Sequence, residues 1–304
     1  MFGFRSDGVK VKKPEAIEKI IPHIMSKGSD AHNWCEVALR CETIDAWIDD
    51  VYKRTGVSFN YLSVIIAAMV RIYAERPKLN RFVMNGRIFQ RNSLTSSITI
   101  KSSLRDDSPD LSMKIRYDGG ESIFEIKQKI DDAVSGLLKK QTNNSTTKTA
   151  GILTSVPNFL IKAAVGLIKF LDKHGMLPKA ILNVSPFHTS FYITNLKSIK
   201  GEWIYHHIYD FGTTGLFISM GKEKQEAVVE NGELAVGKVM RCGITMDERY
   251  CDGFYFIKSL KKLREYIANP SLLEKPLDIE PIESKKERKL RLKSQKKALK
   301  TAKK

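Results

Sequence analysis

Residues Val239–Leu273 read VMRCGITMDERYCDGFYFIKSLKKLREYIANPSLL, and this stretch decides the fold of the chain. Its first part, up to Met246, predicts a buried strand that leads into a charged turn at Asp247–Gly253. Apolar residues then recur every three or four positions over Phe254–Ala268, which predicts an amphipathic helix that ends at Asn269-Pro270. A strand, a tight turn and a helix in this order hold the side chains of the turn rigidly.

The turn, DERYCDG, resembles the C-terminal motif of the dihydrolipoyl acyltransferases of 2-oxoacid dehydrogenase complexes and of the related chloramphenicol acetyltransferase. In that family the motif is H-x-x-x-D-G, commonly D-H-R-x-x-D-G in the 2-oxoacid branch. Asp247, Arg249, Asp252 and Gly253 match it, whereas Glu248 stands where the family has its catalytic histidine. The resemblance therefore implies the architecture of the family more strongly than its catalysis.

A second stretch, FYITNL at residues 191–196, resembles the family's F-T-I-S-N-L-G. The hydroxyl residue of that motif hydrogen-bonds the oxyanion of the tetrahedral intermediate, and Thr194 occupies its position. Lys197 replaces the glycine of the family pattern. A long helix followed by Pro77 and Asn80 is similar to the family's Pro-x-x-Asn turn, so the resemblance covers about residues 14–273.

The resemblance implies an α/β fold, a chloramphenicol acetyltransferase-like two-layer sandwich of a mixed sheet with helices packed on it. We expect residues 1–13 to be an N-terminal lead, residues 14–273 to form the acyltransferase-like domain, and residues 274–304 to be a disordered basic tail. Within the domain, residues 139–183 form an insertion of a polar loop and an apolar helix.

Periodicity and turn residues predict the elements of this domain. Ser58 is the expected cap of the third helix, and Asn85-Gly86 and Asn231-Gly232 are the expected hairpin turns. The expected helices are 14–25, 44–54, 59–76, 122–138, 156–170 and 254–268, and the expected strands are 33–40, 81–84, 87–91, 96–102, 111–117, 187–195, 214–221 and 239–246.

The family chemistry assigns a role to each matched residue. Thr194 is the expected oxyanion donor. Asp252 is counted with Thr194 and Glu248 as a catalytic residue, and it is expected to keep the turn in shape with Gly253. Asp247 and Arg249 are expected to be structural, with Arg249 paired to Asp252 or to another carboxylate. Glu248 then has to replace the imidazole as the base, and a carboxylate is a weak base toward a thiol unless an enclosed apolar channel makes it more basic.

Histidines elsewhere offer other candidates for the base. His188, His206 and His207 all lie in segments that flank Thr194 in the sequence. The adjacent pair His206-His207 is the better candidate, although two neighbouring histidines in an apolar strand are more often a structural pair. No third ligand lies at a convincing spacing, so no metal site is predicted.

The net charge and the cysteines indicate the kind of environment in which the protein works. The 304 residues carry a net charge of +17, and the segment 285–304 holds eleven Lys or Arg and one Glu. Such a tail is either solvated or binds anionic lipid or nucleic acid. The four cysteines, Cys35, Cys41, Cys242 and Cys251, form no CxxC pair, and no signal peptide or transmembrane run is visible. We therefore expect a cytoplasmic protein with structural thiols.

Two readings of the apolar helix at 156–170 stay open. It packs on the domain or in an oligomer interface, or it lies on a membrane surface or walls an acyl-chain tunnel.

The predicted function is acyl transfer from a coenzyme A or lipoyl thioester to an unknown acceptor, by a homotrimer or higher homo-oligomer with sites between its subunits. No lipoyl domain with a modifiable lysine is recognisable, so coenzyme A as the acyl-CoA substrate is the expected small-molecule partner. The alternative is a non-catalytic trimeric relative that binds a ligand or serves as a scaffold.

Overall fold

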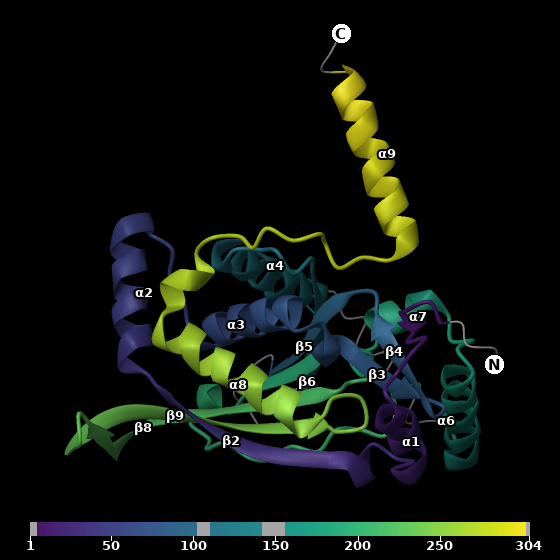
Figure 1. Ribbon diagram of the computed structural model, residues 1–304, viewed down its shortest axis with the longest axis horizontal. Coiled ribbons are helices and arrows are strands. Elements are labelled where there is room, and N and C mark those ends of the chain that lie inside the picture. Colours follow the sequence, from purple (N-terminus) through teal and green to yellow (C-terminus); the bar gives the residue numbers. More distant parts are fainter. Residues whose placement is uncertain (1–4, 102–109, 142–155, 302–304) are drawn as a thin grey trace.

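The computed structural model describes residues 5–101, 110–141 and 156–301, and its centre is a six-stranded sheet (Figure 1). The strand order is β2-β9-β8-β7-β5-β6. β7 runs parallel to both β5 and β8, and the other neighbours are antiparallel, so the sheet is mixed as expected. The strands are β2 (His32–Arg40), β5 (Leu94–Lys101), β6 (Asp110–Tyr117), β7 (Phe191–Asn195), β8 (Leu216–Glu230) and β9 (Glu233–Asp247).

Helices cover one face of this sheet and enclose the main hydrophobic core between the two layers (Figure 1). Alternate strand residues such as Val37, Ile218 and Ile244 point into this core, as the period of two in a strand requires. The covering helices are α2 (Glu42–Thr55), α3 (Tyr61–Glu75), α4 (Ile123–Gln141) and α8 (Gly253–Ala268). The predicted two-layer α/β architecture is confirmed.

Helix α3 lies at the centre of the helical layer, and most of its side chains are buried. It is capped by Asn60, whose side-chain oxygen accepts a hydrogen bond from the Ser63 backbone N–H at 2.9 Å, while Ser63 Oγ accepts from the Asn60 backbone N–H at 3.2 Å. The prediction of Ser58 as the cap was wrong, because Asn60 and Ser63 form a reciprocal capping box and the helix begins only at Tyr61.

Strands β8 and β9 are longer than the sequence predicted and form a hairpin that projects from the body of the molecule (Figure 1). The predicted turn at Asn231-Gly232 is confirmed, and both residues have positive φ, as a tight hairpin turn requires. Three apolar side chains near its tip, Val229, Leu234 and Val236, are more than two-thirds exposed. The tip of the hairpin therefore lies outside the core of the chain.

In the part of the chain that the structure describes, no layer of helices covers the second face of the sheet. Tyr192 on β7 and Phe217 on β8 lie on this face and form a small cluster with Ile208. Residues 200–215, which hold His206 and His207, cross this face without a helix or a strand. The histidine pair was expected in a strand, and this expectation was wrong.

The N-terminal residues form part of the folded domain. Strand β1 (Gly8–Lys10) pairs with β4, so residues 1–13 are not the separate lead that we expected, at least from Arg5 onward. The physical reason is that Arg5 is buried in ion pairs with Asp7 and Asp172. The three-stranded sheet has the order β1-β4-β3, with β3 (Arg81–Met84) and β4 (Arg87–Arg91), and helix α1 (Ala16–Ile24) packs against β4.

Helix α6 (Asn158–Lys173) follows the predicted polar segment, most of which lies outside the described residues. Residues 139–141 were expected in that loop but form the last residues of α4. The α6 side chains Phe159, Leu167 and Phe170 are all more than half exposed. α6 leads into α7 (Lys179–Val184). Among the described residues, no helix is long and apolar enough to cross a membrane.

The C-terminal segment departs most from expectation. Residues 274–284 pack on the domain, where Leu277 and Ile282 donate backbone hydrogen bonds to Gly120 and Asp118. Lys285–Thr301 form helix α9, which points away from the body (Figure 1). The prediction of a disordered tail from residue 274 was wrong, because Ser284 and Glu287 form a capping box that starts the helix.

The described residues also form four short 3₁₀ turns: η1 (Ser29–Ala31), η2 (Pro77–Asn80), η3 (Leu196–Ile199) and η4 (Pro270–Leu273).

Candidate functional site

The turn after β9 is held by an ion pair between Asp247 and Arg249. The guanidinium of Arg249 donates to both carboxylate oxygens, at 2.6 and 2.9 Å, and its backbone N–H donates to Asp247 Oδ1 at 3.0 Å. Both side chains are nearly buried. Arg249 therefore pairs with Asp247 and not with Asp252, one of the two possibilities left open by the sequence.

The rest of the turn is packed against the sheet. Tyr250 is buried, and its hydroxyl lies so close to Gly215 that a Cβ there would be only 2.3 Å away, so this position requires glycine. Burial raises the pKa of the Cys251 thiol to about 12. Cys251 is therefore a buried structural residue with no reactive thiolate at neutral pH.

Asp252 and Gly253 start the following helix. Asp252 is the N-cap of α8, and its carboxylate accepts a hydrogen bond from the Tyr255 backbone N–H at 2.9 Å. Gly253 is the first residue of α8. The exposed Asp252 therefore caps α8, and this capping keeps the end of the turn in shape.

Glu248 lies at the bend between the strand and the helix. Its backbone N–H donates to the carbonyl of Ala31 at 2.9 Å, which fixes the bend against β2. Its side chain is half-buried, and the carboxylate has no hydrogen bond or ion pair to any residue that the structure describes. The backbone of Glu248 is thus fixed, whereas its side chain is held by no polar contact with a described residue.

Thr194 lies on the second face of the sheet, far from Glu248 within one chain. Its Cα partner on β8 is Ser219, whose own partner on β9 is Gly243, five residues before Glu248. Two strand spacings and five residues of strand rise give a separation of about 19 Å between the Cα atoms of Thr194 and Glu248. The two side chains therefore cannot act on one substrate group within a single protomer.

His206 lies on the same face as Thr194. Its Nδ1 donates to the backbone carbonyl of His207 at 2.7 Å, which leaves Nε2 as the basic nitrogen, and burial lowers its pKa. Its ring stacks on Phe217 at 3.9 Å, and Phe217 stacks in turn on Tyr192 at 4.9 Å. His206 is thus a neutral imidazole within a column of rings beside Thr194, and His207 stacks on it at 4.6 Å.

His188 has a structural environment. Its Nε2 lies 3.0 Å from Asp172 Oδ2, and its Nδ1 lies 2.8 Å from Ser185 Oγ. Asp172 also pairs with Arg5 at 3.0 Å, and all four side chains are buried. His188 precedes β7, at the end of the strand opposite to Thr194, so it belongs to a buried network and not to the candidate site.

Sequence reasoning missed one imidazole beside the turn. His32, the first residue of β2, stands opposite Asp247 in the strand register. Its Nε2 is buried without a hydrogen-bond partner, and burial lowers its pKa. The alternating pattern of β2 could have shown which face of the sheet His32 lies on. Only the register with β9 pairs it with Asp247 and so places it next to Glu248.

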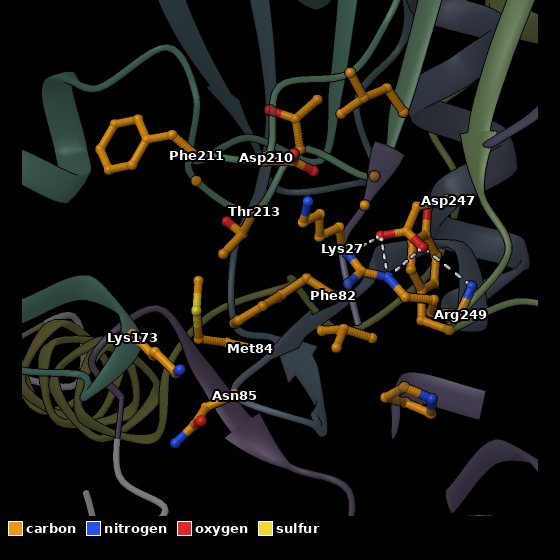
Figure 2. Close-up of a pocket in the computed structure, with 18 of the residues that line it drawn as sticks. Lys27, Phe82, Met84, Asn85, Lys173, Asp210, Phe211, Thr213, Asp247 and Arg249 are labelled. Atoms are coloured by element: carbon orange, nitrogen blue, oxygen red, sulfur yellow. Dashed lines mark hydrogen bonds and ion pairs between the residues drawn. The ribbon is translucent and has the colours of Figure 1, made fainter. Parts of the chain in front are cut away.

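A cavity of about 470 Å³ borders the turn, and Figure 2 shows the Asp247–Arg249 pair at its wall. Charges of both signs line it, including Lys27, Lys173 and Asp210. Thr194, Glu248 and His206 are not among its lining residues. The cavity therefore adjoins the motif turn, but it does not join the candidate residues into one site within a single protomer.

Comparison with known proteins shows which family part of the sequence resembles. Residues 188–274 match the family of the 2-oxoacid dehydrogenases acyltransferase (catalytic domain), a range that includes both Thr194 and the turn. No curated protein matches the sequence.

Solved structures of similar fold belong to the same group. A probable dihydrolipoamide acetyltransferase from Listeria monocytogenes has a TM-score of 0.54 and 17% identity, over 86% of this chain and 94% of that chain. The dihydrolipoamide acetyltransferase of Azotobacter vinelandii has a TM-score of 0.54 and 13% identity, over 80% and 83% of the two chains. The cubic core of the pyruvate dehydrogenase multienzyme complex has a TM-score of 0.53 and 12% identity, over 87% and 94%.

The chain resembles the catalytic domain of the 2-oxoacid dehydrogenase acyltransferases in sequence and in fold. The fold class expected from the sequence, an α/β fold with helices packed on a mixed sheet, is confirmed.

Proposed function

We propose that the protein transfers an acyl group from a coenzyme A or lipoyl thioester to an acceptor, in a homo-oligomer whose sites lie between protomers. The observation that carries this proposal is the position of Thr194 and Glu248. Both lie at the family's motif positions, and both have side chains without a partner among the described residues, yet about 19 Å separates their Cα atoms in one chain.

A second protomer supplies the missing half of each site. The neighbour of similar fold in the pyruvate dehydrogenase complex is a cubic core, which is an assembly of many copies. In the proposed assembly, Thr194 of one protomer faces Glu248 of the next. We expect a homotrimer or a larger closed assembly, because closed symmetry gives every protomer the same contacts.

The proposed reaction requires two tasks of these side chains. The Glu248 carboxylate accepts the proton from the thiol or hydroxyl of the acceptor, whose sulfur or oxygen then attacks the thioester carbonyl. The Thr194 hydroxyl donates a hydrogen bond to the oxyanion that forms. When the intermediate collapses, its carbon–sulfur bond breaks, and the departing thiolate takes the proton from Glu248.

The proposal is tested with acetyl-CoA as the donor and dihydrolipoamide as the acceptor, by following the release of coenzyme A thiol. We expect turnover above the rate without protein, a loss of at least about tenfold in Glu248→Gln, and a gain in Glu248→His, because imidazole is the better base near neutral pH. His32→Gln and His206→Gln are the matched variants for the neighbouring imidazoles, and we expect each of them to retain more activity than Glu248→Gln.

Two outcomes contradict the proposal. If a panel of acyl-CoA thioesters gives no thiol release above background, the protein is a binding or scaffold relative and not an enzyme. If Glu248→Gln has the activity of the wild type while His206→Gln has lost it, the base comes from the same protomer as Thr194.

A further inference from the structure

A second cavity lies away from the candidate acyltransferase site. It has a volume of about 220 Å³ and lies between the N-terminal segment, the β4–β5 turn, β6, α7 and the first turn of α9. Thr95 lines it, four residues before Thr99, which is the β5 partner of Thr194. At the rise per residue of a strand, Thr95 and Thr99 are about 13 Å apart, which separates the cavity from Thr194 by a similar distance. The cavity is thus separate from both Thr194 and the motif turn.

Arg91 and Lys114 contribute to the wall of this cavity, and neither forms an ion pair with a carboxylate of the described residues. Arg91 is 3% exposed, and its terminal nitrogens donate to the hydroxyl and the carbonyl of Thr213, at 2.6 to 3.2 Å. Its Nε is buried and has no hydrogen-bond partner among the residues that the structure places. The guanidinium also lies over the ring of Phe82, 4.6 Å from its centre. Arg91 is therefore held rigidly and keeps one N–H without an acceptor.

Lys114 is the second of these cations. Its ammonium donates to the backbone carbonyls of Leu182, at 2.8 Å, and of Ser185 and His188, and it forms no ion pair with any described carboxylate. Burial and the nearby Arg91 charge lower its pKa to about 7. The ammonium form of Lys114 is thus held by backbone carbonyl dipoles, and no described carboxylate forms an ion pair with it.

The buried charges around the cavity do not balance. When Lys114 is protonated, Arg5, Arg91 and Lys114 are three cations, whereas the buried carboxylates that face them are Asp172 and Asp7, which also lines the cavity. A buried charge without a counter-charge is unfavourable unless an ion of opposite sign binds next to it. The cavity therefore has the electrostatics of a site for an anion.

The rim adds hydrogen-bond donors of the kind that bind oxyanions. Arg116 lies there with Glu287, and the guanidinium donates to both carboxylate oxygens at 2.9 and 3.0 Å. This pair neutralises the one carboxylate that α9 brings to the rim. Lys179, Asn92 and Asn183 also line the cavity, and they can donate to ligand oxygens.

We propose that this cavity binds a small oxyanion, a phosphate or carboxylate group, between Arg91 and Lys114. The proposal does not depend on the acyltransferase function. The shared chemistry of the two ligand classes is a compact group of oxygens with negative charge, which matches the guanidinium and ammonium groups of the site.

The test is calorimetric titration of the full chain with inorganic phosphate and, separately, with acetate. We expect saturable binding of at least one of these ions at one site per chain, and a loss of at least tenfold in affinity in Lys114→Met and in Arg91→Gln. The matched control is Lys258→Met, which removes an equal charge on α8 and should leave the affinity unchanged.

The comparison between phosphate and acetate decides which oxyanion class the site prefers. Circular dichroism checks that each variant is folded, and Lys114→Met decides the test alone if Arg91→Gln does not fold. The proposal is overturned if neither ion binds saturably, or if folded Lys114→Met binds as tightly as the wild type and the Lys258→Met control.

Discussion

Replacing Asp172 by alanine is expected to lower the free energy of unfolding by about 3–5 kcal/mol, the largest stability effect that we predict for one side chain. The Asp172 carboxylate pairs with Arg5 at 3.0 Å and with His188 at 3.0 Å, and its backbone carbonyl accepts from Arg5 at 2.8 Å. The side chains of this network are 1–3% exposed. The substitution leaves the buried guanidinium of Arg5 without one of its two carboxylates. Breaking a buried ion pair is destabilising mainly because the remaining charge is left buried without compensation.

The expected loss also has a topological reason. Arg5 lies in the N-terminal segment and Asp172 at the end of α6, so the pair fastens two segments that are 167 residues apart. Chemical denaturation monitored by circular dichroism measures the effect. Asp131→Ala is the matched control, because Asp131 forms an exposed helical pair with Lys127 that should contribute no more than about 0.5 kcal/mol. Equal losses in the two variants would show that the buried network contributes nothing beyond an exposed pair.

Replacing Thr194 by valine is expected to lower the rate of acyl transfer by about 10²–10³-fold, the range found for removal of one oxyanion donor. Valine keeps the shape and the β-branching of threonine, so the strand and its neighbours should be unchanged. The loss should fall on kcat and leave KM nearly constant, because the hydroxyl acts on the charge that develops in the transition state.

Two further variants separate this role from a structural one. Thr194→Ser keeps the donor and should keep most of the activity. Ser112→Ala removes a hydroxyl from the same face of the sheet, where Ser112 hydrogen-bonds to Tyr192 at 3.1 Å, and it should have little effect on kcat. An unchanged kcat in Thr194→Val would contradict the role of Thr194 as the oxyanion donor.

The local elements of the fold follow from local sequence patterns. The apolar spacing over residues 254–268 predicted α8 to within one residue, and Asn231-Gly232 predicted the turn between β8 and β9, although not the length of the two strands. The start of α9 was also encoded locally, since Ser284 and Glu287 have the spacing of a capping box. The high charge of the tail led to the wrong prediction, because a capped helix can form with little packing.

The contacts that join distant segments could not be predicted in this way. The sequence around Asp172 and His188 did not predict their structural role, because the buried network also needs Arg5, which is distant in the sequence. The partner of Arg249 was ambiguous for a similar reason, since Asp247 and Asp252 are both near it in sequence. The arrangement of the candidate site could not be predicted either, because only the strand register shows that Thr194 and Glu248 lie far apart in one chain.

The central claim, that each active site is shared between two protomers, is tested most directly by mixing two inactive variants. Thr194→Val and Glu248→Gln are co-expressed with different affinity tags, and mixed oligomers are purified through both tags and assayed with acetyl-CoA and dihydrolipoamide. A cyclic trimer that carries both tags has two intact halves at one of its three interfaces, so activity should return to about a third of the wild-type level, and to about a quarter in a larger random assembly. Mixed oligomers as inactive as either parent, from parents that are each folded and oligomeric, would contradict the shared site.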